Sequence, residues 1–228
     1  MTHLEQLLGQ LAILLEERHQ PWALVGGLAV SVRTEPRFTR DLDLAVAVSN
    51  DSEAEALVYG LRAAGFRPLA TVEQQETHRL ATARMVPSGE RPQGIMLDLL
   101  FASSGIEAEI CAQAEPLQVF SDVCVPVARL HHLIALKVLA RDDLARPQDA
   151  VDLRHLISSA EASDQERAHA AVRLIEVRGF NRTRNLTEAL TGAWHEFRPC
   201  SQFGQAVRGG AACAGPAPVA PAILSGLG

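Results

Sequence analysis

The chain has 228 residues, of which 47% are hydrophobic, and its formal net charge is −6 at pH 7. This length supports one sizeable core with at most a small second lobe, and the hydrophobic content excludes a disordered chain. The mildly negative charge gives no general attraction for nucleic acid, so an RNA partner would need a local basic patch.

The sequence favours a cytoplasmic protein with no membrane partner. Arg, Glu or His interrupts every apolar run before it reaches the length that spans a bilayer. The first residues, Met1-Thr2-His3-Leu4-Glu5, lack the basic start and the uninterrupted apolar stretch of a signal peptide. The cysteines are scattered without metal-ligand spacing, so we expect reduced thiols.

Hydrophobic periodicity and cap signals define the elements of the first part of the chain. Leucines at three- and four-residue steps predict an amphipathic helix at the start. Ser52 followed by Glu55 is a capping-box pattern. The expected elements are a helix over residues 4–18, a strand over 22–25, a helix over 28–33, a strand over 42–48 and a helix that begins at Ser52 and ends near Gly65.

The rest of the chain changes from strands to helices. Expected strands cover residues 66–72, 78–85 and 95–101, with short edge strands or a hairpin at 117–120 and 123–127. Expected helices cover residues 129–141, 147–158, 164–178 and 186–196, and the Gly/Ala/Pro composition that follows predicts a disordered tail. We therefore expect an α+β fold with a sheet-containing lobe at 1–128, a helical lobe at 129–196 and a tail at 197–228.

Gly26 and Gly27 close the expected strand 22–25 just before a helix. Glycines at such a turn let a phosphate approach the backbone, and the helix N-terminus offers unpaired N–H groups with a favourable dipole. Many strand–helix turns carry such a pair, so the two glycines alone indicate a phosphate site only weakly.

Asp41 and Asp43 are separated by one residue, next to or within an apolar strand. Alternate side chains of a strand share a face, so both carboxylates point the same way. Joint coordination of a hard divalent ion such as Mg²⁺ is the natural use of such a pair, and Mn²⁺ is a second candidate. The alternative is the solvated face of an exposed strand, which the apolar neighbours Leu42, Leu44 and Val46 disfavour.

Asp98 is the one charge of another apolar segment, Gly94-Ile-Met-Leu-Asp-Leu-Leu-Phe. A lone buried carboxylate is costly unless it is paired or binds a metal. If its strand lies beside the strand of Asp43, three carboxylates converge on a two-metal site with ions about 3.5–4 Å apart.

Lys137 is the only lysine of the chain and lies on the apolar stripe of the expected helix 129–141. An ammonium on that face needs an anion, which is either a triphosphate or a carboxylate. Asp149 and Asp152 share a face of the next helix. Lys137 therefore binds the nucleotide or forms a structural ion pair with Asp152, and the residues alone do not separate Asp149 from Asp152 as the supporting carboxylate.

Two weaker signals remain. Arg40, together with Arg37, precedes the Asp-x-Asp pair and is either a phosphate contact or a surface arginine of a loop. His131 and His132 are adjacent on a helix, where side chains diverge, so we expect two exposed histidines rather than a metal pair.

The Gly-Gly pair, the short helix, Asp-x-Asp and the later strand carboxylate resemble the pattern of polymerase-beta-like nucleotidyltransferases. The segments P-R-F-T-R-D-L-D-L, L-I-A-L-K-V-L-A and R-P-Q-D-A-V-D-L-R-H-L resemble more narrowly the AbiEii/AbiGii toxins, over roughly residues 4–190. The resemblance implies a nucleotidyltransferase-type mixed sheet and a catalytic lobe at 1–128. It also implies nucleotide contacts from Gly26, Gly27 and Lys137, and catalytic, metal-binding roles for Asp41, Asp43 and Asp98, while Arg40 is a candidate nucleotide contact by its position alone.

The same resemblance implies an NTP substrate, a tRNA or protein acceptor and a cognate antitoxin as partner. Three alternatives stay open at this level. The acceptor is a small molecule such as an aminoglycoside, or the domain is a non-catalytic, partner-binding relict. A metal-dependent glycosyltransferase would explain Asp41 and Asp43, but it gives no role to Gly26-Gly27, Asp98 or Lys137.

Overall fold

The computed structural model of this chain describes residues 2–75, 77–89, 94–142 and 145–198. Met1–Arg198 form one compact unit. Of the predicted tail at 197–228, residues 199–228 lie outside the described part of the chain. No helix in the described residues is both long and apolar enough to cross a membrane.

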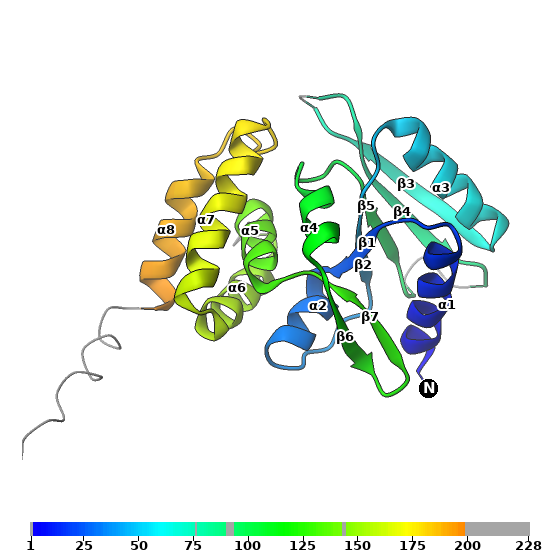
Figure 1. Cartoon of the computed structure of the whole chain (residues 1–228), viewed down its shortest axis with the longest axis horizontal. Coiled ribbons are helices and arrows are strands. Elements are labelled where there is room, and N and C mark those ends of the chain that lie inside the picture. Colours follow the sequence, from blue (N-terminus) through cyan, green and yellow to red (C-terminus); the bar gives the residue numbers. More distant parts are fainter. Residues whose placement is uncertain (1, 76, 90–93, 143–144, 199–228) are drawn as a thin grey trace, which may run out of the picture. The chain divides into compact units, whose positions relative to one another are not determined.

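The order of elements agrees closely with the prediction: helices are interspersed with strands as far as β7, and four helices follow in the described residues (Figure 1). The strands are β1 Trp22–Val25, β2 Leu42–Val46, β3 Phe66–Glu73, β4 Leu80–Pro87, β5 Leu97–Leu100, β6 Glu115–Phe120 and β7 Val123–Val127. The helices are α1 His3–Glu17, α2 Gly26–Arg33, α3 Asp51–Ala63, α4 Glu107–Gln113, α5 Leu130–Ala140, α6 Pro147–Ser159, α7 Ala162–Val177 and α8 Leu186–Phe197.

Two local expectations were wrong. The N-cap of α3 is Asn50, whose side chain accepts a hydrogen bond from the Glu53 N–H, rather than Ser52. Asn is as good a cap as Ser, and Asn50 lies three residues before Glu53, so the helix starts two residues earlier than Ser52 predicts. Helix α4 was missed because seven residues are too few to show a helical period.

The strands form one seven-stranded mixed sheet in the order β3-β4-β5-β2-β1-β7-β6. Strand β2 pairs in parallel with β5 and β1 pairs in parallel with β7, whereas the other neighbours are antiparallel. The residues of β1 are all buried, and so are Leu42 and Leu44 of β2. Central strands buried on both faces explain why these segments are apolar almost throughout.

Helix α5 is the centre of the helical part, because it packs against α6, α7 and α8. Helix α2, which follows β1 directly, also contacts α5 and α6. The strand-to-helix turn at Gly26 is therefore close to the helices that carry Lys137, Asp149 and Asp152 (Figure 1). After Val127 the described residues form helices and no strand, but the separate lobes at 1–128 and 129–196 stay a prediction.

Candidate active site

Two of the predicted carboxylates lie side by side in the sheet. Asp43 of β2 and Asp98 of β5 are direct register partners, and Asp98 in turn is paired with Arg84 of β4. Residues in register on neighbouring strands point to the same face. Asp43, Asp98 and Arg84 thus form a row across three strands.

Asp41 stands immediately before β2 and is electrostatically coupled to this row. Burial and the Asp98 charge raise the pKa of Asp41. Burial raises the pKa of Asp43 to about 6, with further contributions from Asp98 and Asp41, while Lys137 and a hydrogen bond from the Gly27 backbone oppose the shift. The Asp98 charge thus raises the pKa of both Asp41 and Asp43, which marks a site with an excess of negative charge.

The two glycines bring the backbone of α2 against this charge. Gly26 has a positive φ of 65°, and a Cβ added there would overlap the Asp43 carboxylate. A Cβ at Gly27 would overlap the guanidinium of Arg37. Gly26 therefore needs glycine for both its conformation and its close approach to Asp43, whereas a side chain at Gly27 would displace Arg37.

Lys137 forms ion pairs with both Asp149 and Asp152, between which the sequence alone could not decide. Its Nζ lies 2.6 Å from Asp149 Oδ1 and 2.7 Å from Asp152 Oδ2. Arg37 adds a second cation, since its Nη2 donates to Asp152 Oδ2 at 2.9 Å. Asp152 is fully buried; burial opposes its ionisation, but the hydrogen bonds from Lys137 and Arg37 lower the pKa of Asp152 overall.

Arg84 is the site residue that the sequence reasoning missed. Its Nε and Nη2 donate to Asp98 Oδ1 and Oδ2 at 2.8 and 2.6 Å, which is a bidentate ion pair. In the strand as the structure has it, Leu80–Pro87, Arg84 is the one charged residue, but the expected strand 78–85 also held Arg79 and so hid this signal. The argument that singled out Asp98 reaches Arg84 only once the strand begins at Leu80.

Arg40 lies at the edge of this constellation. It is exposed, its guanidinium carbon lies 5.3 Å from the centre of the Phe38 ring, and its charge lowers the pKa of Asp41 against the stronger effect of burial. The structure thus brings together Asp41, Asp43 and Asp98 beside Gly26 and Gly27. It places Arg40 outside the hydrogen-bonded network.

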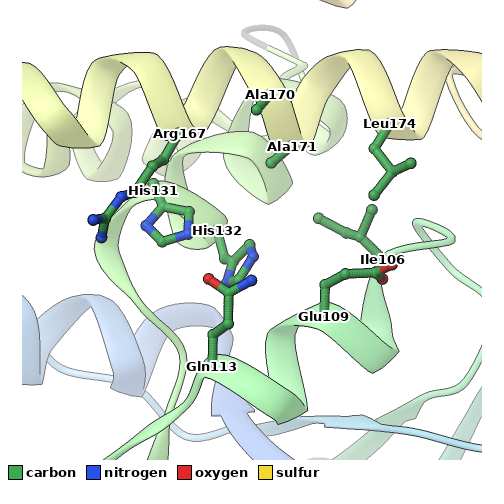
Figure 2. A pocket seen from close by; sticks show the side chains of 9 residues that line it. All are labelled: Ile106, Glu109, Gln113, His131, His132, Arg167, Ala170, Ala171 and Leu174. Atoms are coloured by element: carbon green, nitrogen blue, oxygen red, sulfur yellow. The ribbon is translucent and has the colours of Figure 1, made fainter.

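The expectation of exposed histidines was wrong. His131 and His132 are each only 3% exposed, and their ring centres are 4.2 Å apart. They line a cavity of about 180 Å³ together with residues of α4 and α7, among them Gln113, Arg167 and Leu174 (Figure 2). Burial, and then the neighbouring His131, lowers the pKa of His132 to about 3. Both rings lie in the space between α4 and α7, and these two helices shield them from solvent.

The donor set fits a hard divalent ion only in part. Asp41 and Asp43 offer carboxylate oxygens to a cation. The positive charge of a bound cation would lower their pKa again. The oxygens of Asp98 already accept hydrogen bonds from Arg84. Within the described ranges, no group of three His, Cys, Asp or Glu side chains is arranged as a metal site. Asp41 and Asp43 are therefore available to a metal, and Asp98 is available once Arg84 withdraws.

The fold is that of a nucleotidyltransferase. An antigenic nucleotidyltransferase-like protein from Paracoccidioides brasiliensis matches at 16% identity, with 82% of this chain and 92% of that chain covered and a TM-score of 0.50. The antibiotic-resistance factor ANT(2″)-Ia matches at 17% identity over 84% of this chain and 96% of that chain, with a TM-score of 0.51. ANT(2″)-Ia in complex with adenylyl-2″-tobramycin matches at 16% identity over 78% and 99%, also with a TM-score of 0.51.

The chain belongs to the AbiEii family. The family model described as nucleotidyl transferase AbiEii toxin, type IV toxin–antitoxin system, matches residues 7–205. No curated protein matches the chain. Both the resemblance and the α+β nucleotidyltransferase fold expected from the sequence are thus confirmed, and family and fold together support an enzyme of nucleotidyl transfer.

Proposed function

We propose that this protein is a metal-dependent nucleotidyltransferase that moves an NMP from an NTP onto a tRNA or a protein, as the toxin of a toxin–antitoxin pair. The observation that carries the proposal is the register pairing of Asp43 with Asp98, with Asp41 close enough to raise the pKa of Asp43. Carboxylates at such close quarters are stabilised by a divalent cation, and nucleotidyltransferases of this fold generally use one.

The triphosphate is proposed to bind on the side of Asp43 that faces α2. The N-terminus of α2, which starts at Gly26, favours an anion there through its dipole. Lys137, which acts on Asp43 electrostatically, contributes a positive charge, and Arg40 adds a second from the loop before Asp41. Asp149 and Asp152 support this site by holding Lys137 in place.

The acceptor is proposed to approach from the Asp98 side of the row. The acceptor oxygen attacks the α-phosphorus, the bond to the bridging oxygen breaks and pyrophosphate leaves, while Asp98 assists removal of the hydroxyl proton. Mg²⁺, or alternatively Mn²⁺, held by Asp41, Asp43 and Asp98, would supply charge neutralisation of the phosphates. The residues of the chain orient the two substrates in line, which is the main protein contribution to this kind of transfer.

A macromolecular acceptor is favoured by the family description as a toxin, which also supports a cognate antitoxin as partner. One observation favours a second candidate, a small cationic acceptor. ANT(2″)-Ia shares the fold and its structure holds an adenylylated tobramycin. The net charge of −6 is compatible with such a substrate.

A labelling experiment separates the candidates. The protein is incubated with each α-labelled NTP and Mg²⁺, and in separate reactions with total RNA, cell protein or an aminoglycoside. We expect label on RNA or protein with the wild type and none with Asp43→Ala, whereas Arg79→Gln, which removes a surface ion pair with Asp51, keeps full transfer. Label on the aminoglycoside alone supports the second candidate. If neither transfer nor NTP binding by calorimetry is detected, both nucleotidyltransferase candidates are excluded, and a non-catalytic, partner-binding domain is the explanation that remains.

A further inference from the structure

Arg84 is the cation nearest to the third carboxylate and occupies both of its oxygens. The Arg84 side chain is 42% exposed, whereas the Asp98 side chain is only 13% exposed. A largely buried carboxylate needs a partner, and in this structure the partner is a guanidinium. Arg84 also interacts favourably with Asp41 and Asp43, so its charge offsets the whole row.

The geometry of the ion pair conflicts with metal binding at Asp98. A bidentate guanidinium takes one lone pair of each carboxylate oxygen, on the side that a metal chelated by both oxygens would also use. A divalent ion that ligates the same oxygens would also lie close to a fixed positive charge, and like charges at such distances repel. Asp98 therefore cannot chelate a metal with both oxygens while Arg84 is bound to it, and the two cations compete for this carboxylate.

We propose that Arg84 is a positioning residue that acts through Asp98. It holds this carboxylate in the row before metal arrives and competes with the divalent cation for it. Metal loading at Asp98 then requires the guanidinium to withdraw, so Arg84 sets the metal concentration at which the site fills. The inference rests on the proposed metal-dependent transfer and adds a residue to it.

Withdrawal of Arg84 is sterically feasible. On the side away from Asp98, its register neighbour on β3 is Ala70, a small and exposed residue. The part of the arginine that is accessible to solvent can turn toward water without opening the core. Lys137 differs in this respect, because its side chain is 13% exposed and is held by two buried carboxylates.

The test is a titration with Mn²⁺ alone, followed by the electron paramagnetic resonance signal of the free ion. We compare the wild type, Arg84→Gln, Arg84→Lys and the control Arg79→Gln, which removes the ion pair with Asp51 beside the start of the same strand. Loss of a partly exposed, charge-assisted pair is expected to tighten Mn²⁺ binding about tenfold in Arg84→Gln. Arg84→Lys is expected to lie between the two, and Arg79→Gln to match the wild type.

A second measurement needs no variant. The Nε–H resonance of Arg84, protected by the bond to Asp98, is expected to shift and lose protection from solvent exchange as diamagnetic Mg²⁺ is added. Unchanged or weaker Mn²⁺ binding in Arg84→Gln, or an Arg84 resonance that ignores saturating Mg²⁺, would overturn the role of Arg84 alone. A wild type that binds no Mn²⁺ would overturn the proposed metal-dependent function as well, so the two failures are distinguishable.

Discussion

Asp43 and Asp98 occupy directly opposed positions on the neighbouring parallel strands β2 and β5. Strands in a sheet lie about 4.8 Å apart, so two ionised side chains in register on one face repel each other strongly. Two interactions reduce this repulsion: Arg84 forms an ion pair with Asp98, and the Gly27 backbone N–H donates a hydrogen bond to Asp43. Compensation is incomplete at Asp43, whose pKa stays raised to about 6.

Asp43→Asn is expected to raise stability while it abolishes transfer. The pKa of Asp43 is raised to about 6 from 3.8 by burial, Asp98 and Asp41, so the folded state binds the proton more tightly than the unfolded state. Stability is therefore lost as pH rises from about 4 to about 6, by up to about 3 kcal/mol.

The variant lacks this loss, so its advantage over the wild type should be present at pH 7.5 and vanish near pH 4. Urea unfolding at both pH values measures the difference. Equal stability of the two proteins at pH 7.5 would show that the Asp43 charge is compensated in solution.

Mg²⁺ is expected to stabilise the wild type. At ten times its dissociation constant, a ligand that binds only the folded state adds about 1.4 kcal/mol. For a chain of this size that corresponds to a rise of about 3–5 °C in Tm. Thermal melts with and without Mg²⁺ measure it, and EDTA should abolish both the shift and the transfer. Asp43→Asn serves as the control that should melt at the same temperature in both conditions.

Most of the framework was accessible from sequence, because the signals were local and periodic. The expected strand at 22–25 coincides with β1 Trp22–Val25, and the expected hairpin is formed by β6 and β7. The carboxylates were found by one physical argument, that a lone charge in an apolar strand requires a partner. The same argument missed Arg84, because the expected strand 78–85 also contained Arg79, whereas β4 begins at Leu80.

Pairings between distant segments were not accessible in this way. The hydrophobic pattern of the sequence does not show that β5 lies between β4 and β2. This strand order places Arg84 beside Asp98 and Asp98 beside Asp43. Likewise, helical spacing put Asp149 and Asp152 on one face, but only the packing of α5 on α6 shows that Lys137 contacts both. The burial of His131 and His132 depends on α4 and α7, and α4 was too short to predict.

Gly26→Ala is expected to destabilise the protein and to impair transfer. The residue has φ +65°, and its new Cβ would meet the Asp43 carboxylate, so both strain and displacement of Asp43 follow. A cost of about 1–3 kcal/mol is expected. Gly192→Ala is the matched control, since nothing lies within 4 Å of its Cβ position in α8. That variant should gain about 0.5–1 kcal/mol and keep full transfer; equal effects of the two substitutions would contradict the assigned role of Gly26.

Lys137→Met separates the nucleotide-binding role of Lys137 from its structural role. The substitution leaves Asp149 without its cation, whereas Asp152 keeps Arg37. Removal of one partner from a largely buried pair is expected to cost about 2–4 kcal/mol. It is also expected to lower kcat/KM about tenfold to a hundredfold, since a charge-assisted contact to the triphosphate is lost.

The double variant Lys137→Met/Asp149→Asn removes the unpaired charge as well, so it should recover part of the stability. Transfer should stay as low as in the single variant, because the cation that faces the triphosphate is still missing. Arg178→Gln, which breaks the more exposed pair with Glu109, is the control and should change stability by less than about 1 kcal/mol with unaltered transfer. Recovery of transfer along with stability in the double variant would mean that Lys137 only ties α5 to α6.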